Sequence, residues 1–417
     1  MTSSPSLSSL PSEVVESIVT YLNLREICSL RLASREVNVK SSEGAFRNYF
    51  RDKKIELTSA EQLHLAISSL AQPRCARLLE HLTLIAPSHL HKGRHEERKK
   101  SARLLGKAMK AICLNSGSDY LPYLSLLVEG TPTMADTYPN HDKRQHIWGA
   151  AKRCFEITFL ALASSKLPIG TLDIFGSVTF CSLACDEIAI MLEKVDLSDS
   201  LRPLKQLSIS LSVHDTTPLR KKSLAFGQKH VSSISRFLQL CPNLKALQLH
   251  WYWTLAPVYL SRAMTEETYL FDHIAESCQF PSLERLTLRG IYTSEAALVS
   301  FLRQVKLRSI DIEYIHIKLQ GRFRPVFDCL VEHSEHLEHI HFGNLFEADR
   351  PIFFNDTPES PLFPHSSEGN SPKAIIRTGV YARRPIEYHL RPRNPLPFSC
   401  PMKEAQRKYL SLEYGPW

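Results

Sequence analysis

Four histidines, His333, His336, His339 and His341, lie close together near the end of the chain. Such a cluster could bind zinc, because imidazole nitrogens are common ligands of that metal. No cysteine or carboxylate completes a ligand set with the spacing of known zinc sites. Solvated surface histidines are the simpler interpretation, and the sequence predicts no metal site.

The chain also lacks the short motifs that position catalytic groups or phosphates. It contains no glycine-rich phosphate-binding loop, no G-x-S-x-G nucleophile turn and no H-E-x-x-H zinc helix. Asp186 and Glu187 are adjacent, so on a helix their carboxylates would diverge. The ten cysteines include no C-x-x-C pair, which favours reduced core thiols. The sequence therefore predicts no catalytic residue and no cofactor.

The net charge of +8 is concentrated in two stretches. Residues 91–110 carry eight Lys or Arg against two Glu, and residues 377–393 carry five Arg against one Glu. The Lys-Arg runs at residues 98–100 and 220–222 could bind nucleic acid or act as a nuclear import signal. Without interleaved aromatic residues or a recognisable recognition fold, solvated loops are the better interpretation, and nucleic acid is not an expected partner.

The 417 residues, 43% hydrophobic and 23% charged, have the composition of a globular protein. This composition excludes general disorder and a small disulfide-stapled scaffold. No apolar run approaches the ~20 residues that cross a bilayer. The first 24 residues contain no Lys or Arg, which secretory and transit signals need. We expect a protein of the cytoplasm, the nucleus or both, without a membrane segment.

The first fifty residues have the pattern of three short helices. Apolar residues repeat at helical spacing from Val14 to Leu22, again from Ile27 to Leu32, and on one face from Phe46 to Phe50. Three such helices bury little surface alone. Two interpretations stay open: a helical subdomain that packs on the rest of the chain, or a module that completes its core on a partner protein.

These residues resemble an F-box. The match runs through Leu10-Pro11-x-Glu13, Ile18, Leu22, Glu26-Ile27, Leu30-Arg31-Leu32 and Ser34-Arg35. The continuation is similar to the layout of many filamentous-fungal F-box proteins, in residues Ala45 to Phe50, Ile55-Glu56-Leu57 and Leu79 to Ile85. The chain departs from the family pattern at Ala33, where Val is common, and at Val37, where an aromatic residue often occurs.

The resemblance implies that this segment docks on the Skp adaptor subunit of a cullin-based ubiquitin ligase and, through it, on the cullin. The apolar residues expected to form this surface are Leu10, Pro11, Val14, Ile18, Leu22, Ile27 and Leu30. Some of them must instead face the helical core, and the sequence does not distinguish the two sets.

A three-anchor pattern, apolar-x-x-apolar-x-apolar, recurs eight times in the rest of the chain. Its middle anchors are Leu82, Leu124, Leu172, Leu207, Leu247, Leu286, Ile310 and Ile340. Helical stripes precede several triplets, for example from Ile147 to Leu162. Helices and strands in alternation predict parallel strands with helices outside. Residues 242–247 and 281–286 resemble the strand entry of leucine-rich repeats, with a conventional doubly wound domain as the structural alternative.

In such strands the anchors point inward and the alternate residues face the open, concave side. The concave positions expected to contact a substrate are Phe175, Gln206, Gln248, His250, Arg285, Arg289, Asp311, Glu313, His339 and His341. Arg285 and Arg289 could bind a phosphate or acidic motif, or form ordinary cross-strand salt bridges. The aromatic run at residues 251–253 could join this surface or cover an outer helix.

The predicted fold class is α/β: a short three-helix F-box followed by an irregular leucine-rich-repeat-like solenoid. The predicted regions are a disordered lead (1–9), an F-box-like helical domain (10–57), the solenoid (58–349), a flexible Pro/Ser-rich loop (350–374) and a C-terminal segment that could cap the solenoid (375–417). We expect a non-catalytic adaptor that binds the Skp subunit and an unknown protein substrate. The alternatives are a Skp-binding scaffold outside a ubiquitin ligase, and an enzyme with an unrecognised site in the concavity.

Overall fold

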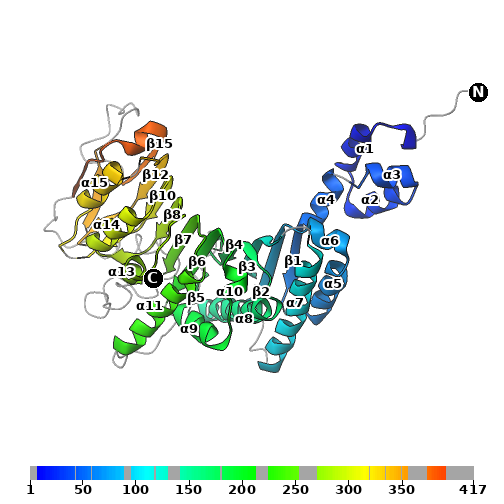
Figure 1. Cartoon of the computed structure of the whole chain (residues 1–417), viewed down its shortest axis with the longest axis horizontal. Coiled ribbons are helices and arrows are strands. Elements are labelled where there is room, and N and C mark those ends of the chain that lie inside the picture. The colour runs from blue at the N-terminus through cyan, green and yellow to red at the C-terminus, as the bar shows by residue number, and fades with distance from the viewer. Residues whose placement is uncertain are drawn as a thin grey trace, which may run out of the picture.

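The computed structural model of the chain describes residues 7–42, 44–57, 59–88, 95–116, 119–129, 141–178, 181–212, 224–252, 270–318, 320–333, 335–348, 350–355 and 373–390. The Lys-Arg run at 220–222, Trp253, and most of the predicted Pro/Ser-rich loop and C-terminal segment lie outside the described residues. Figure 1 shows a small helical unit at the N-terminal end and a larger curved body built on parallel strands.

The N-terminal unit contains one more helix than the sequence predicted. Its elements are η1 (Leu7–Ser9), α1 (Ser12–Val19), α2 (Leu24–Arg31), α3 (Arg35–Lys40) and α4 (Gly44–Arg51). Ser34 begins the additional helix α3, since its hydroxyl accepts a hydrogen bond from the backbone N–H of Val37. Residues 7–9 form one helical turn, so the prediction of a disordered lead is wrong for them.

The body is organised around one sheet of eleven strands, ordered β1-β2-β3-β4-β6-β7-β8-β10-β12-β15, with β5 paired to β6. The strands are β1 (Asp52–Glu56), β2 (His81–Pro87), β3 (Leu121–Glu129), β4 (Ile169–Ile174), β5 (Leu183–Ala184), β6 (Gln206–Ser212), β7 (Ala246–Tyr252), β8 (Arg285–Arg289), β10 (Ser309–Glu313), β12 (His339–Gly343) and β15 (Ala374–Thr378). Neighbours are parallel except β12 and β15. The chain is therefore α/β with a large, mostly parallel sheet.

The eight predicted triplets lie on eight adjacent strands of this sheet. The pairing register aligns their middle anchors, from Leu82 on β2 to Ile340 on β12, in one continuous row. Each middle anchor is at most 2% exposed. This row is the centre of the core, because every anchor packs beside the anchor of the next strand.

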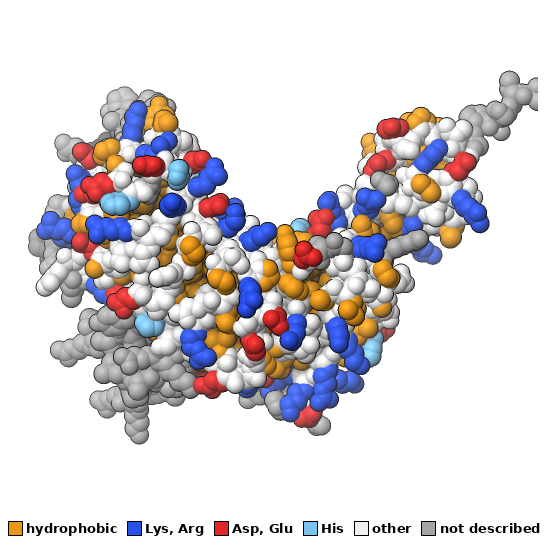
Figure 2. All heavy atoms as spheres, viewed as in Figure 1, with side chains coloured by type: hydrophobic (Ala, Val, Ile, Leu, Met, Phe, Trp, Pro, Cys, Tyr) orange, Lys and Arg blue, Asp and Glu red, His pale blue; other side chains and the backbone are white. Residues whose placement is uncertain are grey.

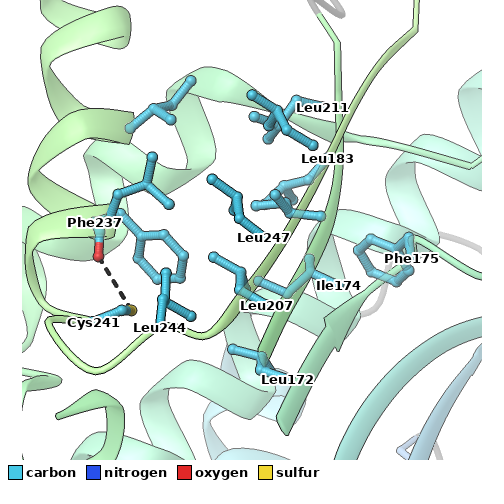
Figure 3. Close-up of a cluster of buried hydrophobic side chains, with 14 of the residues drawn as sticks. Leu172, Ile174, Phe175, Leu183, Leu207, Leu211, Phe237, Cys241, Leu244 and Leu247 are labelled. Atoms are coloured by element: carbon cyan, nitrogen blue, oxygen red, sulfur yellow. Dashed lines mark hydrogen bonds between the residues drawn. The ribbon is translucent and has the colours of Figure 1, made fainter. Parts of the chain in front are cut away.

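Helices cover one side of the sheet and form the outer layer of the body (Figure 1). They are α5 (Ala60–Leu70), α6 (Pro73–Leu78), α7 (His95–Asn115), α8 (His141–Ser165), α9 (Cys185–Lys194), α10 (Ser198–Leu201), α11 (Leu224–Gln239), α13 (Leu270–Ser277), α14 (Glu295–Gln304) and α15 (Arg324–His333). Figure 3 shows how the layers meet: Phe237 of α11 packs toward Leu207 and Leu247, while the Cys241 thiol donates to the Phe237 carbonyl at 3.6 Å.

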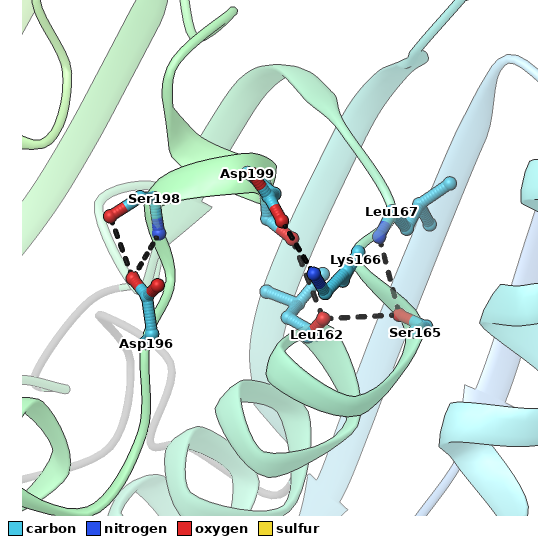
Figure 4. Close-up of polar contacts among 8 residues, drawn as sticks. Leu162, Ser165, Lys166, Leu167, Asp196, Ser198 and Asp199 are labelled. Atoms are coloured by element: carbon cyan, nitrogen blue, oxygen red, sulfur yellow. Dashed lines mark hydrogen bonds and ion pairs between the residues drawn. The ribbon is translucent and has the colours of Figure 1, made fainter.

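The turn from α8 into β4 shows how a helix is ended (Figure 4). Lys166 adopts the left-handed backbone conformation (φ 55°) directly after the helix. Its ammonium group lies 3.0 Å from the Asp199 carboxylate on α10. Just before α10, the Asp196 carboxylate accepts the backbone N–H of Ser198 at 2.9 Å. The Lys166–Asp199 ion pair therefore ties the turn between α8 and β4 to α10.

A second, smaller sheet follows the carboxyl ends of the later strands. It consists of β9 (Tyr292–Thr293), β11 (His316–Ile317), β13 (Phe346–Glu347), β14 (Arg350–Phe354) and β16 (Tyr388–Leu390). Each of β8, β10 and β12 is followed at once by a left-handed residue: Gly290, Tyr314 and Asn344. The same bend therefore occurs at equivalent positions of three successive strands, and it sends each chain into the second sheet.

Several predicted boundaries need correction. β1 pairs in parallel with β2, so residues 52–56 belong to the sheet and not to the helical domain. Residues 350–354, predicted as part of a flexible loop, form β14, which pairs with β13 and β16. At the far edge, β15 runs antiparallel to β12 and leads into η4 (Gly379–Arg383).

The second sheet contains a stack of aromatic rings built around a half-buried histidine whose Nδ1 atom is closed to solvent. The ring of His316 lies between those of Tyr292 and Phe346, with centroid distances of 4.5 and 4.3 Å. Burial lowers the pKa of His316 from 6.5 to about 3. The imidazole is therefore neutral in the folded protein throughout the physiological pH range.

This burial predicts a loss of stability in acid. Between pH 6.5 and about 3 the unfolded chain protonates His316 and the folded chain does not, so the free energy of unfolding falls as the pH falls. One such group contributes a slope of about 1.4 kcal/mol per pH unit. His316→Phe keeps an aromatic ring in the stack and removes the group that takes up a proton in the unfolded chain. Urea unfolding of wild type and of His316→Phe at several pH values measures the difference. An equal pH dependence of the two free energies of unfolding would contradict the prediction.

The N-terminal unit has a core of its own, formed by Val15, Val19, Ile27 and Phe46. Ile27 is fully buried there. We expect Ile27→Ala to destabilise this unit by about 2–4 kcal/mol, because it leaves a cavity in a very small core. Hydrogen exchange should show faster exchange in α1–α4 and unchanged protection of the sheet. Faster exchange of β2 and β3 in the same variant would show that the two cores unfold together.

Candidate partner-binding surfaces

The structure separates the predicted Skp-binding residues into exposed and buried groups. Pro11 is exposed, and Val14 is 43% exposed on α1. Ile18 is half-buried. So are Leu10, Leu22 and Leu30, which in addition pack on the unit's core. Ile27 is one of the residues that face the helical core instead of a partner, since it is fully buried in the centre of the unit.

Other exposed apolar side chains of this unit were missed by the sequence reasoning. Leu32 is 88% exposed, Tyr21 86% and Val39 71%. Leu24, Cys28 and Leu32 follow one another at four-residue intervals and are all exposed, so they form a stripe along α2. This stripe lies on a different face of α2 from the buried Ile27. The sequence pattern does not show which face is exposed, because both faces are apolar.

Polar contacts fix the helices that carry this surface. Asn23 and Glu26 form a reciprocal capping box at the start of α2. The Arg31 guanidinium lies 3.8 Å from the centre of the Phe46 ring and donates to the Asn38 side chain. The Tyr49 hydroxyl donates to the Leu22 carbonyl at 3.0 Å. The apolar stripe is therefore held on a defined scaffold.

Most of the predicted substrate-contacting residues lie in three rows across the inner face of the sheet. The row nearest the amino ends of the strands includes Gln206, Arg285 and His339. The next includes Gln248, Asp311 and His341, and the third includes His250, Arg289 and Glu313. The register thus brings together residues up to 133 positions apart, from 206 to 339.

Two of these residues are not accessible, against the prediction. Phe175 is fully buried, because the chain leaves β4 through this residue in the left-handed conformation (φ 60°) and its ring enters the core. His250 is 5% exposed, with its ring 4.0 Å from that of Tyr252, whose hydroxyl meets the Val178 carbonyl. Burial and the neighbouring Arg289 lower the pKa of His250 to about 3.

The solvent exposure of the inner face therefore differs from one part of the sheet to another. At the carboxyl ends of β6 and β7 it is closed, since Ser210, Ser212 and His250 are all buried. On β8, β10 and β12 it is open, with Arg285 exposed and Arg289, Asp311, His339 and His341 half-exposed. The usable surface is the part carried by the later strands.

The open part contains a network of four charged or titratable groups. Arg289 lies 3.5 Å from Asp311 and 3.4 Å from Glu313, both on the neighbouring strand β10. His341 lies 3.0 Å from Asp311 on the other side. Arg289 thus forms the cross-strand salt bridges that the sequence left as one of two interpretations.

The network sets the charges of its members. Burial alone would raise the pKa of Asp311, but the hydrogen bond from His341 and the charge of Arg289 outweigh it, so the pKa is lowered. The hydrogen bond to Asp311 raises the pKa of His341. The carboxylate is therefore ionised at neutral pH, and the imidazole takes up a proton more readily than a free histidine.

The histidines of the C-terminal region do not form a common site. His333 and His336 are exposed at and after the end of α15, while His339 and His341 are on β12. Within the part of the chain that the structure describes, no three side chains of the metal-binding types converge.

The comparisons with known proteins identify no relative. No protein-family model matches the chain, and no curated protein sequence matches it. None of the described helices combines the length and apolar character that a bilayer crossing requires.

The network predicts different effects for two arginines on one strand. Arg289→Ala should lower the free energy of unfolding by about 1 kcal/mol at pH 7, because Asp311 and Glu313 lose their common counterion. The loss should shrink as the pH falls through the lowered pKa of Asp311, since protonation of this carboxylate removes its need for a cation. Arg285→Ala is the matched control, because no ion pair of Arg285 is present among the described residues. Equal losses in urea unfolding would contradict the assignment.

Proposed function

We propose that this chain is a non-catalytic substrate-recognition adaptor of a Skp–cullin–F-box ubiquitin ligase. The observation that carries the proposal is the concentration of exposed apolar side chains in the N-terminal unit. Of the thirteen large hydrophobic residues that are exposed in the described chain, seven lie between Leu7 and Tyr49. A unit with a four-residue core and so much open apolar surface is suited to completing its packing on another protein.

The resemblance to an F-box names the partner that this surface would bind. Pro11 and Val14 are among the residues expected from the F-box resemblance, and Tyr21, Leu24 and Leu32 are further exposed apolar side chains of the same unit. The Skp subunit would cover these side chains and connect the chain to a cullin. The chain itself would supply proximity and orientation, while ubiquitin transfer would take place on other subunits.

The open part of the inner face is the surface that we assign to the protein substrate. It presents Arg285, His339 and His341 along a stretch where the strands are not covered. Its cations and carboxylates lie side by side in adjacent register positions, which suits a polar partner segment laid across the strands. The burial of Phe175 and His250 excludes them from this assignment.

Capture of the ligase subunits tests the proposal. Tagged wild-type chain should retain both the Skp subunit and the cullin. Val14→Asp/Leu32→Asp should lose both, because it places two carboxylates in a surface that must be desolvated. These positions are preferable to Leu10 and Ile18, whose partial burial would make a loss of folding hard to separate from a loss of binding.

The control carries the same two charges on the body. Leu65→Asp/Leu114→Asp replaces leucines that are 62% and 74% exposed on α5 and α7, and it should retain both subunits. Retention of Skp without cullin would favour a scaffold outside the ligase. Failure of folded wild-type protein to retain Skp would overturn the proposal.

A further inference from the structure

Helix α7 presents a row of cations on the outside of the body. Lys100, Arg103, Lys107 and Lys110 are all exposed and follow one another at intervals of three, four and three residues. This spacing places them on one stripe of the helix. The opposite face, which includes Met109, is buried in the core. In Figure 2, Lys and Arg side chains gather over α7 at the lower right. We call these four residues the α7 cation row.

Among the described residues, no acidic side chain pairs with the α7 cation row. Arg98 and Lys99, at the start of the helix, are paired with Glu156 at 2.7 Å and with Glu96 at 3.4 Å. In the described part of the chain, the four residues of the row make no ion pair and no hydrogen bond through their side chains. Like charges three and four residues apart repel one another along a helix. An external anion would remove this repulsion.

We propose that the α7 cation row binds an acidic polypeptide segment of a partner protein. The row extends over eleven residues of helix, from Lys100 to Lys110, about 15 Å at the usual rise, which a segment of roughly five extended residues would cover. Four residues after Lys110, on the same stripe, Leu114 is 74% exposed. A partner segment with a run of acidic residues and one apolar residue at its end complements both features.

Two other anionic partners fit the row less well. Single-stranded nucleic acid is held by aromatic side chains beside cations, and α7 contains no Phe, Tyr or Trp. A membrane surface requires an apolar face next to the cations, and this stripe offers one leucine only. The row is also separate from the N-terminal unit and the inner face, because α7 packs against α5, α6 and α8 in the outer layer. The inference therefore goes beyond the proposed adaptor function and does not depend on it.

Fluorescence anisotropy with the full-length protein tests the inference. The probe is a labelled peptide of six glutamates followed by glycine and leucine. Arg103→Glu/Lys107→Glu should weaken its binding by about tenfold or more at low salt, because two attractive contacts become repulsive. The matched control, Arg202→Glu/Lys306→Glu, changes the net charge equally at two exposed cations away from α7 and should alter binding less than twofold.

The outcomes separate the specific row from general charge effects. Equal weakening by both variants would overturn the inference, since net charge alone would then explain binding. Tighter binding of a single-stranded oligonucleotide of equal charge, or of vesicles with anionic lipid, would also overturn it. If both variants melt at the same temperature as wild type, unfolding is excluded as the cause of a loss of peptide binding. Arg103→Glu/Lys107→Glu should capture as much of the Skp subunit as wild type. Failure of the inference about the α7 cation row is therefore distinguishable from failure of the adaptor proposal.

Discussion

The alignment of eight apolar anchors in one register row is the constraint on which the rest of the body depends. A shift of one residue in any strand would turn its anchor from the core to the inner face. Leu247, Leu286 and Ile310 are on successive strands and lie 39 and 24 residues apart in sequence, yet the register places them side by side. The segments between strands can therefore vary in length, because only the anchors must meet.

The same alignment arranges the inner face. Once the anchors are fixed, the alternate residues of each strand must stand next to those of its neighbours. Arg289 reaches Asp311 and Glu313 for this reason, and Asp311 reaches His341. The network is thus a consequence of core register, and the charges of its members follow from mutual proximity rather than from any local sequence motif.

The repeating anchors could be read from the sequence because they are periodic and local, and each triplet carries its own signal. Accessibility could not be read in the same way. His250 occupies the alternate position of its strand, as Arg289 does, but residues after the carboxyl end of β4 cover the region around it. Phe175 leaves its strand in a left-handed conformation that its residue type does not indicate, since the glycine of this turn is the next residue, Gly176. The third helix α3 and the burial of Ile27 depend on how short helices pack together, which their individual patterns do not specify.

The junction between the two parts of the molecule connects the two surfaces that the proposed adaptor function requires. No residue separates α4 from β1, since Arg51 ends the helix and Asp52 begins the strand. The Arg51 side chain pairs with Glu80 at 2.9 Å, and the Arg51 carbonyl accepts the backbone N–H of Glu80. Asp52 contacts His81 at 2.6 Å on the neighbouring strand. A helix that continues directly into a paired strand transmits its orientation without a flexible linker. An adaptor that acts by positioning requires this property, because proximity accelerates a transfer only when the distance between donor and acceptor is restricted.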